Sequence, residues 1–517
     1  MNKICVTPAL AVVILALNTG STGSEQGPAG SFPAVTEELI AEKDAAAPED
    51  DDEDSVSSDG RHAAWRTGRE KKWSVVLDGK RVPGEFEEVT SLTFSLDGKH
   101  LAFAGRRGKA WMMVVDGKEP TQTYEKMSAP QFTGDGTRLA FAGMLQGKFN
   151  IVVNSETVGA PFDLTDLLMF SPGGDRLAVV GLRKGKRLVM VDGKEGPPFD
   201  VIGGLKFSHD GRHFAYGGAD IKSGFGGDKG LGRVVIDGEP GPQHQGEKTS
   251  SFLKAMAMGP TSLAPGYFAD LSHWLHGVSS PVFTPDGSRV AYVAHRGKDD
   301  EVVVVDGQPG AQFPLITTPL VFCPRGQRLA YGVRRGDNDE TVIVDGQSGP
   351  KVASVESMPW FCGEGRHIAY LVSDAGGKFL MVDGARVGLA LLADADYVSW
   401  SGFSPDGRRV AYVVARSNLT ILARNAKRRV YVDGQPGPLY DSRALGLIGF
   451  TPDSRHVVYL VHNLKDSSPK DSFVVVDQAE GKRYDSVWAR TLEVREREIS
   501  YVAQSGAKFL RVTQAIQ

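Results

Sequence analysis

From residue 55 onward, short apolar runs alternate with polar turns, and this alternation recurs about every 38 residues. Each copy opens with an aromatic residue and Ser-x-Asp-Gly, continues through an apolar segment ending in Ala-Phe or Ala-Tyr, and crosses a stretch rich in Gly, Lys and Arg. It closes on Val-Val-Val-Asp-Gly and Gly-Pro-x-Phe/Tyr. The opening aromatic residues are Phe94, Phe132, Phe170, Phe207, Phe283, Phe322, Phe361, Phe403 and Phe450. With an earlier copy at Val56 and a degenerate copy over 492–512, the chain contains ten or eleven repeats.

Two Asp-Gly pairs divide each repeat into four apolar segments, as Asp97-Gly98 and Asp116-Gly117 do in one copy. Asp-Gly between β-branched runs is a strong hairpin signal, because both central residues of the tight turn need positive φ. Four short strands joined by hairpins form an antiparallel meander, which is the blade of a β-propeller. The sequence therefore predicts an all-β propeller of about 10–11 four-stranded blades.

The turn residues themselves are interpreted as structural. Gly173, Arg325 and Glu364 replace the first Asp in three copies, and Asn154 replaces the second in another. A turn tolerates such changes and a ring of metal ligands does not. The residue two positions after the first turn is always basic, and we expect it to pair with the neighbouring turn Asp. These residues are His62, His100, Arg138, Arg176, His213, Arg289, Arg328, His367, Arg409 and His456.

The segments 404–412 (SPDGRRVAY) and 284–292 (TPDGSRVAY) resemble the TolB-type, WD-like propeller repeat. The resemblance covers about residues 55–517 and lacks the Gly-His and Trp-Asp pairs of eukaryotic WD repeats. It implies a fold and says little about activity. Its relatives include TolB, which works through protein contacts, and the propeller that gates prolyl oligopeptidase-like enzymes. Those enzymes carry their chemistry on a separate α/β-hydrolase domain, for which this chain offers neither room nor a Gly-x-Ser-x-Gly motif.

The number of rings depends on the long step between Phe207 and Phe283. We expect two tandem propellers, with blades 1–5 over 55–240 and blades 6–11 over 282–517. The alternative is one large ring, in which residues 32–39 supply the outer strand that the last copy lacks. The surplus residues 241–281 form an insertion whose apolar spacing predicts one or two short helices. Its exposed aromatic side chains, expected to cap the ring, are Phe252, Tyr267, Phe268 and Trp274.

The N-terminus adds a targeting segment and a spacer. A single Lys3 precedes an apolar run over 9–17, which is too short to span a bilayer comfortably. We therefore expect a signal peptide over 1–23 and an exported protein, periplasmic or extracellular, with an uncleaved anchor as the alternative. Residues 24–54 are predicted to be an acidic disordered spacer, and a tether that docks on the basic body is the alternative. The chain has a net charge of −4, but residues 55–517 carry 57 Lys and Arg against 52 acids.

That positive charge gathers in the loops between the second and third strands of each blade. The candidate binding residues there are Arg106, Arg107, Lys109, Arg183, Lys184, Lys186, Arg187, Arg334, Arg335, Lys427, Arg428 and Arg429. On one rim they would attract anions, although ordinary solvated hairpins have the same composition. The expected partner is a protein or an acidic polymer or glycan. Nucleic acid is not expected, because no known binding module for it is present.

Two cysteines and two histidines are candidates for a disulfide and a metal site. Cys323 and Cys362 occupy the same place in adjacent copies, and we expect two buried thiols. His273 and His276 share a helix face in the insertion, but zinc requires further ligands, so we expect no metal and no cofactor. The chain is thus interpreted as a non-enzymatic scaffold that binds through its loop face. The alternative is a polymer-acting hydrolase or lyase with its site at the channel mouth.

Overall fold

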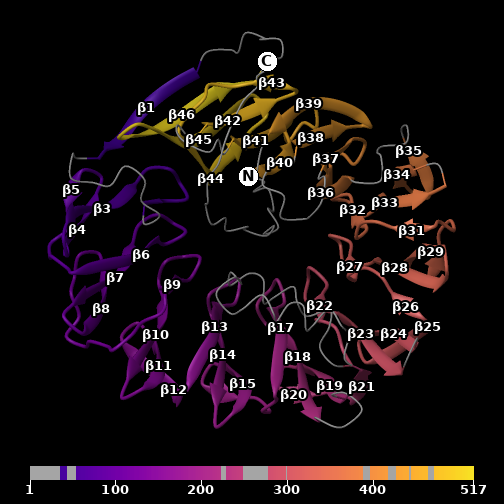
Figure 1. Cartoon of the computed structure of the whole chain (residues 1–517), viewed down its shortest axis with the longest axis horizontal. Coiled ribbons are helices and arrows are strands. Elements are labelled where there is room, and N and C mark those ends of the chain that lie inside the picture. Colours follow the sequence, from indigo (N-terminus) through magenta and orange to yellow (C-terminus); the bar gives the residue numbers. More distant parts are fainter. Residues whose placement is uncertain are drawn as a thin grey trace.

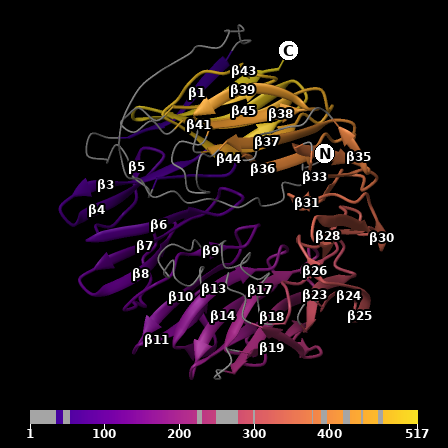
Figure 2. The ribbon, with the colours of Figure 1, turned by 45° about the vertical axis from the view of Figure 1, so that its right-hand side comes forward.

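The structure is a computed structural model of the 517-residue chain. It describes residues 35–43, 54–222, 229–247, 277–297, 300–375, 377–387, 396–416, 427–441, 444–463 and 471–516. Every element in these ranges is a strand, and the strands form eleven antiparallel sheets. Figure 1 shows the sheets arranged around one ring, and Figure 2 shows the same ring tilted. Within each sheet we call the strands a to d, from the innermost outward.

The first five blades follow the repeat closely, and they differ mainly in the length of strand d. Blade 1 comprises β2 (Ser55–Val56), β3 (Ala63–Arg69), β4 (Lys72–Leu77) and β5 (Lys80–Arg81); blade 2 comprises β6 (Glu88–Phe94), β7 (Leu101–Arg107) and β8 (Ala110–Val115); blade 3 comprises β9 (Gln131–Phe132), β10 (Leu139–Leu145), β11 (Lys148–Val153) and β12 (Glu156–Phe162); blade 4 comprises β13 (Leu164–Phe170), β14 (Leu177–Arg183), β15 (Lys186–Val191) and β16 (Lys194–Glu195); blade 5 comprises β17 (Val201–Phe207), β18 (Phe214–Lys222), β19 (Lys229–Ile236), β20 (Glu239–Pro240) and β21 (His244–Glu247). In blade 2 the fourth position is held by a bridge from Val115 to Lys118.

The remaining blades continue the ring, and in two of them strand a is split into two pieces. Blade 6 comprises β22 (Val282–Phe283), β23 (Val290–Gly297), β24 (Asp300–Val305) and β25 (Gln308–Phe313); blade 7 comprises β26 (Leu315–Ile316), β27 (Val321–Phe322), β28 (Leu329–Gly336), β29 (Asp339–Val344) and β30 (Gln347–Ser348); blade 8 comprises β31 (Ser354–Val355), β32 (Trp360–Phe361), β33 (Ile368–Asp374), β34 (Gly377–Val382) and β35 (Ala385–Val387); blade 9 comprises β36 (Asp396–Phe403), β37 (Val410–Arg416), β38 (Lys427–Val432) and β39 (Gln435–Asp441); blade 10 comprises β40 (Ala444–Phe450), β41 (Val457–Asn463), β42 (Asp471–Val476) and β43 (Ala479–Glu480); blade 11 comprises β44 (Ser486–Val494), β45 (Glu498–Ser505), β46 (Lys508–Ala515) and β1 (Val35–Glu42).

The expectation of two tandem propellers is wrong, because blade 6 packs on blade 5 as any other neighbours pack. At this joint a Cβ on Gly287 would lie 2.8 Å from the Asp210 carboxylate, and His244 contacts Tyr292. The additional residues in the sequence therefore do not separate the two sheets, whose buried side chains form one cluster. The helices expected over 241–281 are not found: residues 241–247 and 277–281 contain no helix, and the rest of the insertion lies outside the described residues.

The alternative closure is the one observed. Strand β1 pairs antiparallel with β46 from Val35–Gln514 to Glu42–Lys508 and so completes blade 11. Glu37 reaches into blade 10, where it accepts hydrogen bonds from the Lys482 ammonium at 2.7 Å and the Tyr484 hydroxyl at 2.6 Å. The first and last parts of the chain therefore share one sheet, which removes the edge that β46 would otherwise expose.

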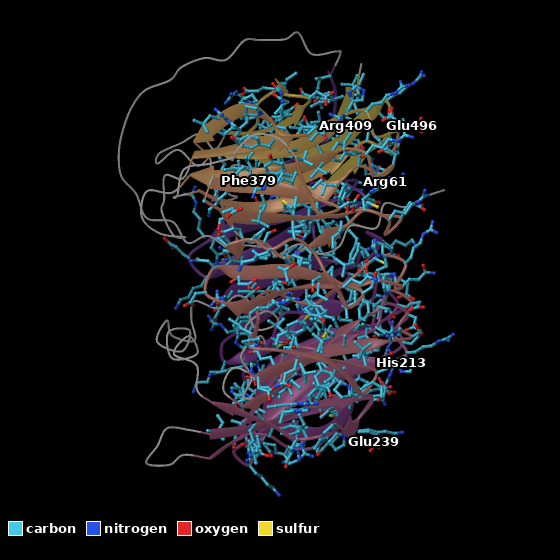
Figure 3. All side chains as sticks on the ribbon, turned by 90° about the vertical axis from the view of Figure 1, so that its right-hand side faces the viewer. Arg61, His213, Glu239, Phe379, Arg409 and Glu496 are labelled. Atoms are coloured by element: carbon cyan, nitrogen blue, oxygen red, sulfur yellow. The ribbon has the colours of Figure 1, made fainter. Side chains whose placement is uncertain are left out.

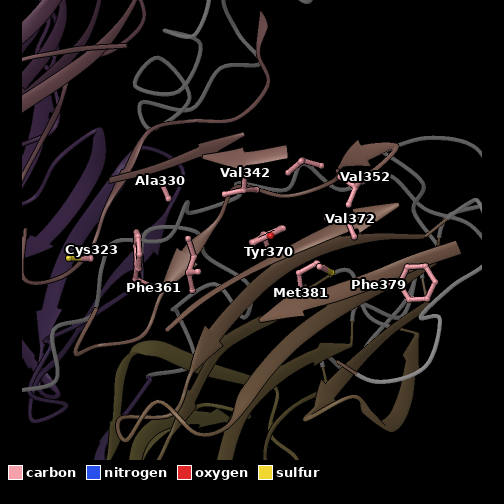
Figure 4. Close-up of a cluster of buried hydrophobic side chains, with 11 residues drawn as sticks. Cys323, Ala330, Val342, Val352, Phe361, Tyr370, Val372, Phe379 and Met381 are labelled. Atoms are coloured by element: carbon pink, nitrogen blue, oxygen red, sulfur yellow. The ribbon is translucent and has the colours of Figure 1, made fainter. Parts of the chain in front are cut away.

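The core is divided among the joints between neighbouring blades. Figure 4 shows one such joint, where Cys323, Ala330 and Val342 of blade 7 meet Phe361, Tyr370 and Val372 of blade 8. Each buried cluster draws its side chains mainly from two adjacent blades, so stability accumulates joint by joint, as in other repeat proteins.

The basic residue after the first turn plays a structural role, as expected. In nine repeats it bonds the Asp of the second turn in its own blade, for example His100 Nδ1 to Asp116 at 2.8 Å and Arg176 Nε to Asp192 at 2.9 Å. The arginines also cross to the next blade, because Arg176 donates to the Arg212 carbonyl at 2.7 Å and lies over the Phe207 ring. The nine pairs are His62–Asp78, His100–Asp116, Arg176–Asp192, His213–Asp237, Arg289–Asp306, Arg328–Asp345, His367–Asp383, Arg409–Asp433 and His456–Asp477.

The prediction of two buried thiols is also confirmed. Cys323 and Cys362 are both buried and free. Each stands where other repeats have Ser or Thr, and its Sγ accepts the backbone N–H of the basic residue five positions later, at 3.3 Å from Arg328 and 3.2 Å from His367. The sulfur therefore replaces a hydroxyl in the turn.

Candidate functional site

The hairpins place the turns of every blade on two opposite faces of the ring. The turns between strands a and b and between c and d form one face, which we call the turn face. The b–c hairpins and the d–a connections form the other, the loop face. Figure 3 shows the ring from the side, with Arg61, His213 and Arg409 of the turn face toward the right and Phe379 toward the left. Every basic hairpin, and both ends of the insertion, belong to the loop face.

The basic hairpins of the loop face are largely neutralised within the chain. In blade 2, Arg107 makes a two-pronged ion pair with Glu119, at 2.6 and 2.7 Å, and its guanidinium lies over the Phe86 ring. The Glu119 hydrogen bonds raise the pKa of Arg107 further. Arg106 pairs with Glu87 and Glu88 in the same way.

The hairpin of blade 4 repeats this arrangement. Arg183 pairs with Glu195, and Arg187 Nε donates to Asp166 at 2.8 Å. Lys186 lies between two carboxylates, 2.7 Å from Asp200 and 2.9 Å from Asp220, and these hydrogen bonds raise its pKa. The positive charge read from the sequence is thus balanced by acids that follow elsewhere in the repeat.

The remaining predicted residues are distributed differently. Lys109 and Lys184 are exposed at hairpin tips, and Arg335 donates to the Ser348 hydroxyl. Arg428 and Arg429 are half-buried in β38, which begins at Lys427. The insertion residues Phe252, Tyr267, Phe268 and Trp274 lie outside the described residues, as do His273 and His276. The ring thus separates the basic residues into sectors rather than gathering them at one point.

A cavity of about 210 Å³, lined by both polar and apolar side chains, opens between blades 6 and 7. Its most buried charged group is Glu301, which is 6% exposed. Glu301 accepts a hydrogen bond from the Ile316 backbone N–H at 2.6 Å and lies 3.0 Å from His295 Nδ1. The Thr317 hydroxyl is buried at the same cavity and has no hydrogen-bond partner within the described part of the chain. The cavity therefore offers a carboxylate, an imidazole and an unused hydroxyl side by side.

Arg334 completes the lining and connects the cavity to the next joint. Its guanidinium donates to Glu340 at 2.7 Å, and Glu340 in turn accepts the Val355 N–H at 2.8 Å. Glu340 is 2% exposed and stands in blade 7 where Glu301 stands in blade 6. Two consecutive joints thus contain a buried glutamate that bonds the inner strand of the following blade.

The sequence reading included Arg334 but missed Glu301, His295 and Glu340. The available signal was the repeat register, because the second residue of strand c is aromatic in blades 1 to 3 (Trp73, Trp111 and Phe149). An acid at that register, at the start of a Val run, is the departure that marks the site.

The cavity owes its space to a broken inner strand. In blade 7 the strand is interrupted between β26 and β27 by Thr317-Thr318-Pro319, and Pro cannot donate to the ladder. At this break the Thr318 hydroxyl takes the place of a backbone carbonyl and accepts the Gly332 N–H at 2.7 Å. Ser279 does the same for Val293 in blade 6 at 2.9 Å. The kink leaves a gap against the preceding blade, which the polar side chains line.

The insertion is rooted one joint away. His244 occupies the aromatic position of the Gly-Pro-x-aromatic motif and packs edge-on against Tyr292, with ring centroids 6.2 Å apart. Gly277, the first described residue after Glu247, has φ of +94° and lies directly against the His244 carbonyl. Burial lowers the pKa of His244, and the charges of Arg296 and His295 lower it further. The described residues on the two sides of the insertion, His244 and Gly277, therefore lie in contact. Gly277 is two residues before Ser279, which lines the cavity.

Comparison with known proteins finds structural neighbours among solved structures and shows no family. The chain matches no protein-family model and no curated protein. Among solved structures it is similar to a eukaryotic initiation factor (10% identity, 77% of this chain and 89% of that one, TM-score 0.34) and to TolB from Acinetobacter baumannii (13%, 58% and 79%, 0.23). It is also similar to an acylaminoacyl peptidase from Pyrococcus horikoshii (11%, 66% and 58%, 0.28), so it spans little more than half of that enzyme. TolB and other β-propeller proteins are thus its structural neighbours, and some of these neighbours are peptidases.

Two further observations concern the described residues alone. No helix within them is long and apolar enough to cross a membrane. No group of three or more His, Cys, Asp or Glu side chains in those ranges is arranged to hold a metal ion.

Proposed function

We propose that this protein is an exported, non-enzymatic scaffold that holds a protein partner against its loop face. The observation that carries the proposal is the cavity between blades 6 and 7, where Glu301, His295 and the Thr317 hydroxyl, which has no partner among the described residues, lie beside the root of the insertion. A concave site with a few converging polar groups is a typical anchoring point for a ligand side chain.

The ion pairs of the hairpins favour a protein over an acidic polymer. Arg107, Arg183 and Lys186 already bond carboxylates of this chain, so a polyanion would have to displace those carboxylates to bind there. Exchange of one set of ion pairs for another brings little net affinity. A protein can instead place one polar side chain in the cavity and leave the pairs of the rim intact.

Site-specific photo-crosslinking in the producing cell tests this proposal. A photoreactive residue at Arg335, on the hairpin of blade 7, should capture one protein partner. The same residue at Lys99 or Arg212 of the turn face, whose side chains are 76% and 82% exposed, should capture none. The Thr317→Val variant replaces the hydroxyl, which has no partner among the described residues, by a methyl group of similar size, and should weaken capture at Arg335 without changing Tm.

Two results would contradict the proposal. Equal capture from both faces would show that the loop face has no special role. Tight binding of a purified polyanion such as heparin by the full chain, lost steeply with added salt, would favour the acidic polymer instead.

A further inference from the structure

Blade 10 departs from the repeat at both of its turns on the turn face. In blades 1 to 9 the first turn ends in Gly, but here it is Asp453-Ser454, and Ser454 has φ of +66°. The second turn is Asp477-Gln478, and Gln478 has φ of +78°. Side chains with a β-carbon adopt this left-handed conformation at an energetic cost. Two such residues in one blade point to a local requirement other than turn formation.

A second cavity, of about 260 Å³, lies beside these turns, between blades 9 and 10. Gln478 and Arg455 of blade 10 line one side, and Arg409 of blade 9 lines the other. The walls are apolar, formed in part by Val430 and Val457. This cavity is on the opposite face from the one described above.

The enclosure of the tyrosine hydroxyl differs from joint to joint. A Cβ placed on Gly437 of blade 9 would lie 4.0 Å from the Tyr459 hydroxyl, against 2.5 Å for Gly196 and Tyr216 and 3.3 Å for Gly349 and Tyr370. At Gly241 and Gly310 no tyrosine atom lies within 4 Å, so an open joint also occurs elsewhere in the ring. What this joint adds is the cavity itself, which Tyr459 lines.

The polar groups at this cavity are mostly donors. Tyr459 is 2% exposed, and its buried hydroxyl interacts with the Tyr440 hydroxyl and has no other hydrogen-bond partner within the described residues. The Arg455 side chain is 80% exposed, and its Nε lies 3.9 Å from Asp453, too far for a hydrogen bond. The carboxylate of Asp477 is already used, because it accepts the Val457 N–H at 2.9 Å and bonds His456. A guanidinium and a phenol are thus available with no free acid to satisfy them.

We propose that this cavity binds a small carboxylate carried on a short apolar body. The carboxylate would accept hydrogen bonds from Arg455 and the Tyr459 hydroxyl, Gln478 would close over it, and the apolar body would lie against the valines. Hydrogen bonds of this kind between a charged donor and a carboxylate are among the stronger polar contacts in proteins. A free organic acid and the C-terminal residue of a peptide both present this chemistry. The inference is independent of the function proposed for the loop face.

Isothermal titration of the full chain tests the inference and distinguishes the two sources. Valerate should bind and its amide, valeramide, should not, since only valerate carries the negative charge. A peptide ending in Val with a free carboxylate should bind, and its amidated form should not, if peptide termini are the natural source. The Arg455→Ala and Tyr459→Phe variants should each weaken binding about tenfold, corresponding to one lost hydrogen bond of about 1.4 kcal/mol.

Matched variants on other blades separate binding from folding. Arg212 occupies the place of Arg455 in blade 5, with 82% exposure and 3.8 Å to Asp210, so Arg212→Ala should bind like the wild type. Tyr216→Phe is the corresponding control for Tyr459→Phe. Gln478→Gly should raise Tm and weaken binding, whereas Ser155→Gly, at the other described non-glycine second turn, where φ is +75°, should raise Tm alone.

Two outcomes would overturn the inference. One is that neither valerate nor the free-acid peptide binds. The other is that a carboxylate binds equally well to the wild type, Arg455→Ala and Tyr459→Phe. Because none of these measurements involves the loop face, their failure would leave the proposed function unaffected.

Discussion

The two faces of the ring are made from the same repeat but follow different rules. On the turn face the same residue types recur from blade to blade, and His100 and Arg176 make equivalent bonds to the Asp of the second turn. On the loop face one repeat position, the second residue of strand c, holds Trp111 in blade 2 and Glu301 in blade 6. The residue types on the turn face are those that a tight hairpin requires. The residue types on the loop face differ with the blade that packs against them.

The loop face should give the largest single effect. Glu301→Ala leaves the Ile316 N–H and His295 without their acceptor in a buried joint, and we expect it to lower the free energy of unfolding by about 2–3 kcal/mol. Urea denaturation of the full chain measures this loss.

The matched control is Glu119→Ala, which breaks the exposed pair with Arg107 on the same face. We expect this variant to lose less than about 1 kcal/mol. If the two variants were equally stable, burial of the glutamate would not be what distinguishes the blades 6–7 joint.

A pair of glycines, one on each face, should differ in the stability lost on substitution by alanine. Gly98 of the turn face and Gly108 of the loop face have φ of +73° and +60°, so alanine at either place is strained by about 1–2 kcal/mol. Only Gly98 has a neighbour, because its Cβ would lie 3.0 Å from the Asp59 carboxylate, while nothing lies within 4 Å at Gly108. Gly98→Ala should therefore destabilise more than Gly108→Ala by thermal unfolding. Equal losses would mean that adjacent turns do not support one another.

As the pH falls, we expect the joint that contains His244 to lose stability before the turn at Asp97 does. Burial and the nearby Arg296 lower the pKa of His244 below its usual value of about 6.5. A lowered pKa means that the neutral form is favoured on folding, so this contribution is complete above pH 6.5 and is lost as the pH falls through the folded-state pKa. Other side chains facing this ring are His295, Arg296 and Tyr292, with Glu301 on the far side of His295.

The His244→Phe variant restores the aromatic residue of the repeat and should remove this pH dependence. Amide hydrogen exchange of β21 and β23 between pH 7 and 5 would measure it. Unchanged pH dependence in His244→Phe would assign the effect to another group.

Asp97 of the turn face should respond at lower pH, with the smallest effect of these variants. Hydrogen bonds from Ser95 and Lys99 lower the pKa of Asp97 from 3.8 to about 2, although burial opposes the shift. The stability that this bond provides is present above pH 4 and is lost as the pH falls toward 2. Ser95→Ala should raise the pKa of Asp97 toward its ordinary value, as NMR titration of the carboxyl carbon would show. An unchanged pKa would mean that the Ser95 hydroxyl does not support the turn.

Much of the architecture could be predicted because it is local. The Asp-Gly pairs and Val runs predicted four strands per repeat, and Asp116 and Gly117 form the expected turn with positive φ at both residues. The pairing of His100 with Asp116 and the free thiols of Cys323 and Cys362 were also predicted correctly. Each depends on residues fewer than 25 positions apart in one repeat, or on the comparison of one repeat with the next.

The predictions that were wrong concerned residues that are separated along the chain but lie close together in the structure. The sequence favoured two rings because 76 residues separate Phe207 from Phe283, but a connection can leave the ring and return without parting two sheets. It treated Arg107 and Arg183 as free charges because Glu119 and Glu195 lie twelve residues away, beyond the next strand and its turn. Side-chain partners across a sheet depend on register, which the periodicity alone did not specify.

The sequence by itself therefore determined the blade, and the tertiary structure determined the ring. The blade is specified by turn chemistry and alternation, since positive φ at Asp-Gly and apolar strand positions act within one repeat. The ring depends on contacts that no repeat contains, namely the pairing of β1 with β46, the reach of Glu301 to Ile316 and the opening beside Tyr459. Such contacts join residues of different blades, and only the closure of all eleven sheets around one axis brings those residues together.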